Sequence, residues 1–142
     1  MDDVATLYCR FIDSVNHRRL SDLDQFLAAR VVQHAPDPAI GIDAASQPLA
    51  RWLAAVPDAQ LVIEDLVVEG DHLMARLRAS GTRREPAIGN APTATRVNVP
   101  VLEAWSVRDG QCVERWLHVD RGTCADPSRD GPASDGRRQG PA

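Results

Sequence analysis

The stretch LVIEDLVVEGDHLMARLRAS, residues 61–80, carries the strongest structural signal in this chain of 142 residues. Its residues follow a period of two on both sides of Gly70 and Asp71, and that period is typical of β-strands. A Gly-Asp pair between two such runs is typical of a tight turn. The stretch therefore predicts a hairpin whose strands span residues 61–69 and 72–80.

A second hairpin is expected further along the chain. Residues 95–107 read as a long strand, Asp109 and Gly110 as a turn, and residues 112–120 as the returning strand. We expect a loop with Pro86, Gly89 and Pro92 to separate the two hairpins. From residue 123 onward the chain is rich in Gly, Pro and Ser and nearly devoid of apolar residues. This composition predicts one domain over residues 1–122 and a disordered tail over residues 123–142.

The first third of the chain has a helical period instead. Apolar residues three and four apart predict an amphipathic helix over residues 3–19. A short helix should follow Ser21, then a strand over residues 31–34. Another helix should begin near Ser46, because Pro48 is best tolerated in a first turn. Helices followed by hairpins indicate an α+β domain, with helices packed on one face of a curved antiparallel sheet that encloses a pocket.

Composition narrows the possible functions. The net charge of −4 argues against a nucleic-acid binder, and the 44% of hydrophobic residues is ordinary for a globular domain. No apolar run is long enough to span a membrane, and the N-terminus is acidic, so we expect a cytoplasmic protein. The three cysteines are widely spaced, which argues against a structural metal site. The sequence has no Gly-rich phosphate loop, so we expect no nucleotide cofactor either.

The last predicted strand contains VERWLHVD, residues 113–120, and one of its faces is chemically mixed. Alternation places Glu114, Trp116, His118 and Asp120 on the same side of the strand. A face that joins an indole to an imidazole and two carboxylates is unusual for a core. We therefore expect it to form the wall of a pocket.

Several short motifs, taken in order, resemble one family. They are a strand ending in His34, EGD at 69–71, GT at 81–82, G-x-x-P-T at 89–93 and DGQCVERWLHVD at 109–120. Over residues 3–122 this pattern resembles the SnoaL-like polyketide cyclases, a branch of the nuclear transport factor 2-like superfamily. The resemblance implies a cone-shaped α+β fold with a deep pocket. It also implies cofactor-independent chemistry on an aromatic polyketide and a homodimer or homotetramer.

The resemblance also implies roles for individual residues. Asp120 matches the general acid/base of an intramolecular aldol closure, which His118 and His34 would assist. Ser106 and Arg83 stand where the cyclases commonly carry histidines, so both are expected at the substrate. The remaining residues expected to line the cavity are Trp116, Trp52, Tyr8 and Leu102.

Two alternatives stay open at this point. The first is a cofactor-free hydroxylase, in which the enolate of the substrate itself would attack oxygen. The second is a non-catalytic ligand-binding or assembly domain, because a fold does not fix a function. The altered positions Ser106 and Arg83 favour the second alternative, whereas Asp120 and His118 on one face favour an enzyme.

Overall fold

The computed structural model describes residues 3–88 and 91–120, so the predicted tail at 123–142 lies outside the described residues. Helix α1 spans Val4–Asn16, close to the prediction. Its first turn is capped by Asp3, whose side chain accepts a hydrogen bond from the Thr6 amide at 2.8 Å. The short 3-10 helix η1 at Leu20–Gln25 follows as expected.

Helix α2 spans Ile42–Ala55, which makes the predicted start near Ser46 wrong. Pro48 lies inside the helix and is exposed to solvent. The first turn contributes Ile42 and Ala45 to the same apolar stripe as Leu53. We infer that burial of these side chains offsets the cost of Pro48, which lacks an amide hydrogen and whose ring crowds the preceding turn, about 3 kcal/mol in a helix interior. Tertiary packing, and not the proline, sets where the helix begins.

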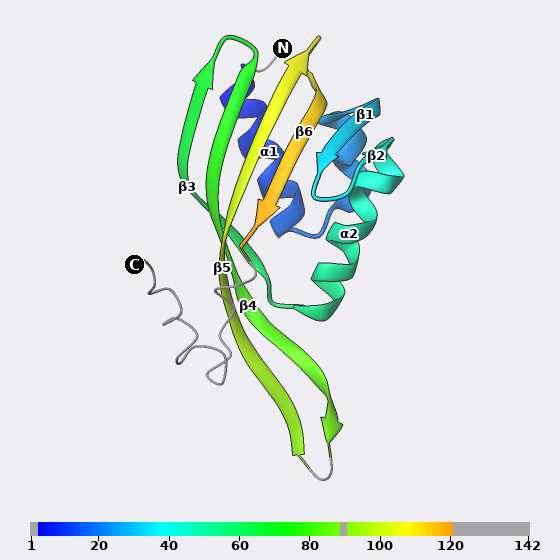
Figure 1. Ribbon diagram of the computed structural model, residues 1–142, viewed down its shortest axis with the longest axis vertical. Helices are drawn as coiled ribbons and strands as arrows, with labels where there is room; N and C mark the ends of the chain where they lie inside the picture. The colour runs from blue at the N-terminus through cyan, green and yellow to red at the C-terminus, as the bar shows by residue number, and fades with distance from the viewer. Residues whose placement is uncertain (1–2, 89–90, 121–142) are drawn as a thin grey trace, which may run out of the picture.

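In the described residues, six strands form a single curved sheet in the order β2-β1-β6-β5-β4-β3 (Figure 1). The predicted hairpins are present as β3 with β4 and β5 with β6. Strand β1 is longer than the predicted 31–34 and pairs in parallel with β6, while the other pairs are antiparallel. The strands span Leu27–Ala35 (β1), Ala39–Ile40 (β2), Gln60–Glu69 (β3), His72–Ile88 (β4), Ala91–Arg108 (β5) and Gln111–Val119 (β6).

The loop expected around Pro86 and Pro92 is largely strand instead. Beyond the last β3–β4 pair, Gln60 with Ser80, strands β4 and β5 continue together as a two-stranded ribbon that projects from the body (Figure 1). Pro86 falls between Glu85 and Ile88, where the register shifts. A proline is compatible with a strand at such an irregularity, because no ladder hydrogen bond is required there.

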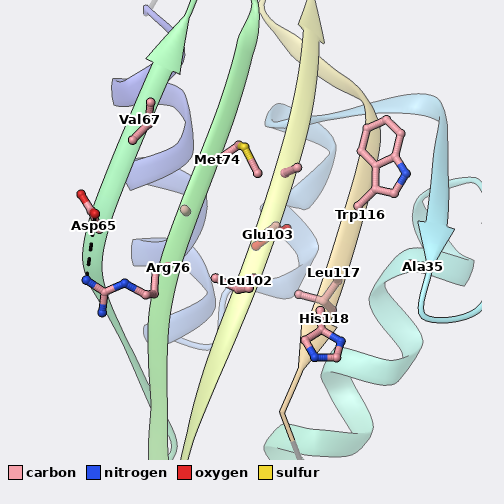
Figure 2. A pocket seen from close by; sticks show the side chains of 12 residues that line it. Ala35, Asp65, Val67, Met74, Arg76, Leu102, Glu103, Trp116, Leu117 and His118 are labelled. Atoms are coloured by element: carbon pink, nitrogen blue, oxygen red, sulfur yellow. Dashed lines mark ion pairs between the residues drawn. The ribbon is translucent and has the colours of Figure 1, made fainter.

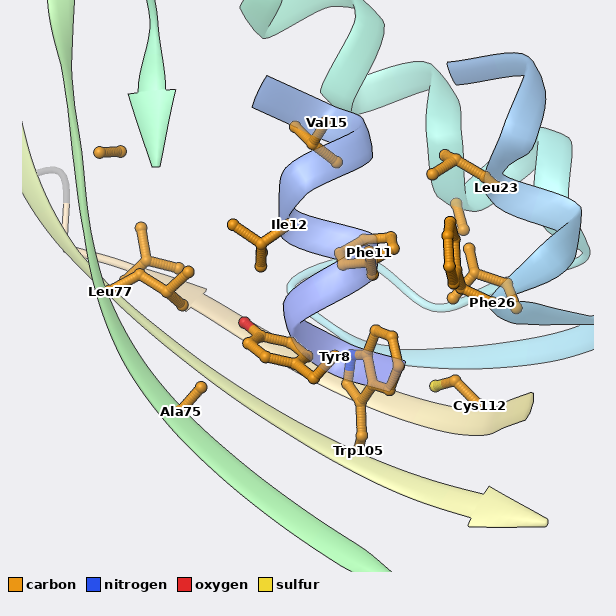
Figure 3. Packing of buried hydrophobic residues seen from close by; sticks show 14 of the residues in the cluster. Tyr8, Phe11, Ile12, Val15, Leu23, Phe26, Ala75, Leu77, Trp105 and Cys112 are labelled. Carbon is orange, nitrogen blue, oxygen red and sulfur yellow. The ribbon is translucent and has the colours of Figure 1, made fainter. Parts of the chain in front are cut away.

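The core lies between α1 and the concave face of the sheet (Figure 3). Tyr8 and Phe11 each place their rings 5.0 Å from the Trp105 ring in edge-on contacts. Leu77 of β4 and Phe26, just after η1, close the same cluster. The face of the sheet turned away from α1 is called the open face below. The region that the sequence predicted to be a pocket under the helices is thus filled with aromatic side chains.

Candidate functional site

Strand β6 places its two sets of side chains on opposite faces of the sheet. Arg115 is buried on the core side, where its guanidinium lies 5.7 Å from the Phe11 ring. Trp116 is 39% exposed and His118 is also exposed. Because alternate residues of a strand point to opposite faces, Glu114, Trp116 and His118 lie together on the open face. This mixed face is therefore turned away from the helices.

A groove with a volume of about 380 Å³ crosses the open face from β3 to β6 (Figure 2). Three of the residues predicted for the site line it: Trp116, His118 and Leu102. The other lining residues are Ala35, Asp65, Val67, Met74, Ala75, Arg76, Glu103, Ala104 and Leu117.

The strand register explains why this groove is apolar in the middle and polar at its edge. Leu102 pairs with His118, and Ala104 pairs with Trp116. The small Ala104 leaves space between Trp116 and Met74, which is itself paired with Ala104 from the other side. At the β3 edge, Arg76 lies 2.7 Å from Glu64 and 4.0 Å from Asp65. The groove therefore offers an apolar floor with an imidazole at one end and an ion-pair network at the other.

Asp120 lies just beyond this groove and is not one of its lining residues. Its amide donates a hydrogen bond to the Pro100 carbonyl at 3.1 Å, two residues past the pair formed by Leu102 and His118. Residues two apart on a strand are separated by about 7 Å. The backbone of Asp120 therefore lies next to the end of the groove that His118 lines, and the facing of its carboxylate stays a prediction of the alternation.

His34 is brought to the same region from strand β1. Its ring stacks on Trp116, with centroids 4.5 Å apart and an interplanar angle of 17°. Its Nε2 lies 3.1 Å from Glu114 Oε2. A carboxylate only accepts hydrogen bonds, so Nε2 carries the proton in this contact. His34 does not line the groove and instead lies behind the Trp116 ring.

Tyr8 does not line the groove, because it is fully buried in the core on the other side of the sheet. Its hydroxyl donates to Glu103 Oε1 at 2.8 Å. Glu103 also accepts from Trp105 Nε1 at 2.8 Å and from Arg115 Nε at 3.0 Å. The fifth member is Gln33, whose Oε1 accepts from Arg115 Nη1 at 3.4 Å.

These buried groups hold their protons firmly. Burial raises the pKa of the Tyr8 phenol, and the nearby Glu103 carboxylate raises it further. Burial alone would lower the pKa of Arg115, but the attraction of Glu103 outweighs it and the pKa is raised. The cluster therefore joins a neutral phenol and a permanent cation around one carboxylate. Sequence reasoning missed it, although Glu103 alternates with Val101 and Trp105 on the core face, and that pattern was visible.

The other three predicted residues are dispersed. Trp52 is half-buried on α2 and packs against the core. Ser106 lies on the open face beyond Trp116, with its Oγ 3.2 Å from His72 Nδ1. Arg83 belongs to the projecting ribbon, where it pairs with Thr95. The structure thus brings Trp116, His118, Leu102 and His34 together and places the backbone of Asp120 beside them. Tyr8, Trp52, Ser106 and Arg83 lie apart from this group.

A second cavity of about 570 Å³ lies where the start of α1 meets the β3–β4 and β5–β6 turns, and no predicted site residue lines it. Within residues 3–88 and 91–120, no cluster of three or more His, Cys, Asp or Glu side chains is arranged to hold a metal ion. No helix in the described part of the chain is long and apolar enough to cross a membrane.

The chain matches a family profile described as SnoaL-like polyketide cyclase over residues 5–126. IdmH from Streptomyces antibioticus, a proposed polyketide cyclase, is 25% identical, with a TM-score of 0.77 and coverage of 87% of this chain and 96% of IdmH. TsrD from Streptomyces laurentii is 29% identical, with a TM-score of 0.71 and coverage of 84% and 91%.

AclR from Streptomyces galilaeus, a proposed hydroxylase, is 22% identical, with a TM-score of 0.71 and coverage of 82% of this chain and 88% of AclR. At that identity the likeness shows the fold alone. None of the curated proteins compared with the chain matches it.

Proposed function

Because the chain belongs to the SnoaL-like polyketide cyclase family, we propose that it is a polyketide-tailoring enzyme that closes a ring by an intramolecular aldol reaction. The substrate is a flat, conjugated polyketide that binds in the open-face groove. The observation that carries this proposal is the groove itself, in which Trp116, Leu102 and His118 meet over an apolar floor.

The groove chemistry suits such a substrate. Indole stacks favourably on a conjugated ring system, and Leu102 and Met74 extend the apolar contact across two further strands. The volume of about 380 Å³ falls in the range of small-molecule sites. Holding a flexible chain so that the reacting carbons are close is itself a large contribution to the rate.

The reaction requires one base and one acid. A base removes a proton from a carbon flanked by carbonyl groups, and the resulting enolate carbon attacks a ketone carbon. The new carbon–carbon bond converts the ketone into an alkoxide, which takes a proton and becomes a hydroxyl. We assign proton removal and return to Asp120, with His118 as its partner about 7 Å along the same strand. Acid–base catalysis of this kind contributes about 10²–10⁴-fold.

The proposal is tested by incubating the protein with a polyketide that carries an activated methylene and a ketone placed for ring closure. Formation of the cyclised alcohol, which has the mass of the starting material, should be faster than in buffer. A groove-blocking variant, Leu102→Arg, should abolish this acceleration, and Ala54→Arg on the exposed side of α2 should not. Equal turnover by Leu102→Arg and wild type would place the reaction elsewhere.

Hydroxylation is the closest competing reaction. It would join O₂ to the substrate enolate as a hydroperoxide, which then loses water to leave a new carbonyl group. The product would gain one oxygen and lose two hydrogens, so it would be heavier than an aldol product. Running the reaction without oxygen separates the two, because aldol closure consumes no O₂. If turnover stops under anaerobic conditions, the reaction is hydroxylation and not cyclisation.

A non-catalytic assembly domain is a second candidate, and one observation favours it. Val67, Met74 and Leu102 are 60%, 64% and 51% exposed on the open face, next to Trp116. An apolar patch of this kind is often covered by a partner. We propose that a second copy of the chain is that partner, which gives the homodimer that the family resemblance implies.

Sedimentation velocity tests this second candidate. Met74→Glu should convert a dimer to monomers, whereas Ala54→Glu should leave the mass unchanged. If Met74→Glu is monomeric and the wild type turns over no polyketide, the role as an assembly domain is favoured. Full turnover by a monomeric wild type would favour the enzyme.

A further inference from the structure

We infer that His34 and Glu114 are positioning residues for Trp116, and that neither acts directly on a substrate. Together they hold the indole as a fixed wall of the groove. The inference concerns a triangle of three side chains on two neighbouring strands, His34 from β1 and Glu114 and Trp116 from β6. The expected effect on ligand binding rests on the proposed function, whereas the expected restriction of the indole does not.

Trp116 needs such support because the residues paired with it on the two neighbouring strands are small. Its partner across β5 is Ala104, whose methyl group cannot confine an indole. Its partner on β1 is Ala35, which is equally small. With 39% of its surface exposed, the ring would otherwise be free to change rotamer.

His34 supplies the missing contact. The two rings are nearly parallel, at 17°, and their centroids are 4.5 Å apart, which is the geometry of an aromatic stack. The ring of His34 thus covers one face of the indole. Because His34 lies outside the groove while Trp116 lines it, the other face or an edge of the indole is the part that a ligand meets.

Glu114 fixes His34 in turn. Its Oε2 accepts a hydrogen bond from His34 Nε2 at 3.1 Å, and it lies two residues before Trp116 on the same side of β6. The carboxylate therefore ties the imidazole to the strand that carries the indole. A planar ligand bound on the other face of the indole would complete a stack of three rings, namely ligand, Trp116 and His34.

This arrangement identifies the chemical class of ligand that the wall selects. A flat, conjugated ring gains contact over the whole indole, whereas a puckered aliphatic ring does not. It also assigns His34 a role different from the catalytic one that the family resemblance suggested. A catalytic imidazole has to reach the reacting atoms, while this one lies behind the indole and is held by Glu114 through Nε2.

The first experiment measures the indole without any ligand. In a Trp52→Phe background, acrylamide quenching of fluorescence reports mainly on Trp116, because Trp105 is only 1% exposed. His34→Ala and Glu114→Ala should each raise the quenching constant. His34→Phe should leave it near the wild-type value, because a phenyl ring restores the stack. Glu69→Ala and His72→Ala serve as controls, since they remove an acid and an imidazole from β3 and β4.

The second experiment uses 1,8-dihydroxyanthraquinone as the probe and measures its Kd. His34→Ala should weaken binding about threefold to tenfold, the change expected for a displaced aromatic stack. His34→Phe should bind the probe like wild type, because a phenyl ring restores the stack on Trp116. In a Trp116→Leu background, His34→Ala should have no further effect. Unfolding midpoints measured alongside separate these effects from loss of the fold.

The outcomes are distinguishable. If His34→Ala leaves both the quenching constant and the Kd unchanged, or if His34→Phe weakens probe binding as much as His34→Ala does, the positioning role is overturned. If the wild type does not bind the probe while the quenching constants change as expected, the proposed function fails and the support of Trp116 stands.

Discussion

Glu103 and Arg115 form an ion pair on the core side of the sheet, with only 3% and 7% of their side chains exposed. Tyr8 and Trp105 donate further hydrogen bonds to the same carboxylate. A buried charge that loses its partner is left without compensation, which makes such pairs costly to break. The pair therefore fixes β5 against β6 directly beneath the groove.

Replacing Glu103 by Gln should destabilise the protein by about 3–5 kcal/mol, because Arg115 then keeps its charge without a counter-ion. Urea unfolding followed by circular dichroism measures the change. Glu64→Gln, which weakens an exposed pair with Arg76, should cost less than about 1 kcal/mol. Equal losses for the two variants would show that Arg115 does not depend on Glu103.

Gly81 lies in β4 against Val56, Asp58 and Ala59, which follow α2 in the chain. A Cβ added there would lie 2.4 Å from Val56 Cγ1 and 3.1 Å from Ala59 Cα. Gly81→Ala should therefore destabilise the fold by about 1–3 kcal/mol through overpacking. Adding Val56→Ala should relieve part of this loss, so the two changes should be non-additive in thermal or urea unfolding.

Gly70→Ala is the matched control for that prediction. Gly70 has a positive φ, +60°, and no described atom beyond its two chain neighbours would lie within 4 Å of an added Cβ. Gly70→Ala should cost only the strain of holding alanine at a positive φ, about 1–2 kcal/mol, and Val56→Ala should not change that cost. Strict additivity between Gly81→Ala and Val56→Ala would contradict the steric account.

Stability should fall in alkaline solution, and Cys112 should account for the first part of the fall. Burial raises the pKa of its thiol from 9.0 to about 12. Below pH 9 the thiol is protonated in both the folded and unfolded chains, so its contribution is constant. Above pH 9 the unfolded chain loses this proton first, so stability decreases by up to about 1.4 kcal/mol per pH unit until about pH 12.

Urea unfolding under reducing conditions at pH 7, 9 and 10 measures this slope. Cys112→Ala should flatten it between pH 9 and 10, whereas Cys9→Ala should not, because Cys9 is exposed. Above pH 10 the raised pKa of Tyr8 adds a second loss of the same sign. A slope that survives in Cys112→Ala would assign the alkaline loss to other groups.

Much of the fold was predictable because each element has one apolar face. The period of two in residues 61–80 and the helical period of residues 3–19 correctly located β3, β4 and α1. The misplaced start of α2 had a physical reason. Pro48 disfavours a helix locally, but the decision depended on what Ile42 and Ala45 would bury, and that is a tertiary property.

The site was harder to predict for a related reason. Alternation in VERWLHVD correctly separates two faces but does not say which one meets the helices. A charged Arg115 suggests solvent and an indole at Trp116 suggests a core, yet the structure has the reverse. The reversal depends on Glu103, a partner 12 residues away that neutralises Arg115 inside the core.

Trp116 is also the residue through which the groove should recognise a planar ligand. Trp116→Ala should weaken the binding of an anthraquinone probe by about tenfold or more, since it removes the aromatic ring that lines the groove. Trp52→Phe, on α2, should leave the affinity unchanged. Isothermal titration calorimetry measures both. Equal affinity for wild type and Trp116→Ala would move the binding site away from the open face.

The most direct measurement is the single-turnover rate of ring closure by Asp120→Asn, compared with Asp109→Asn as a matched change in the β5–β6 turn. The amide keeps the shape of the side chain but cannot accept the substrate proton. We predict that Asp120→Asn lowers the rate by about 10²-fold or more, with substrate affinity preserved, and that Asp109→Asn has the wild-type rate. An Asp120→Asn rate within about threefold of wild type would contradict the assignment of Asp120 as the acid–base group.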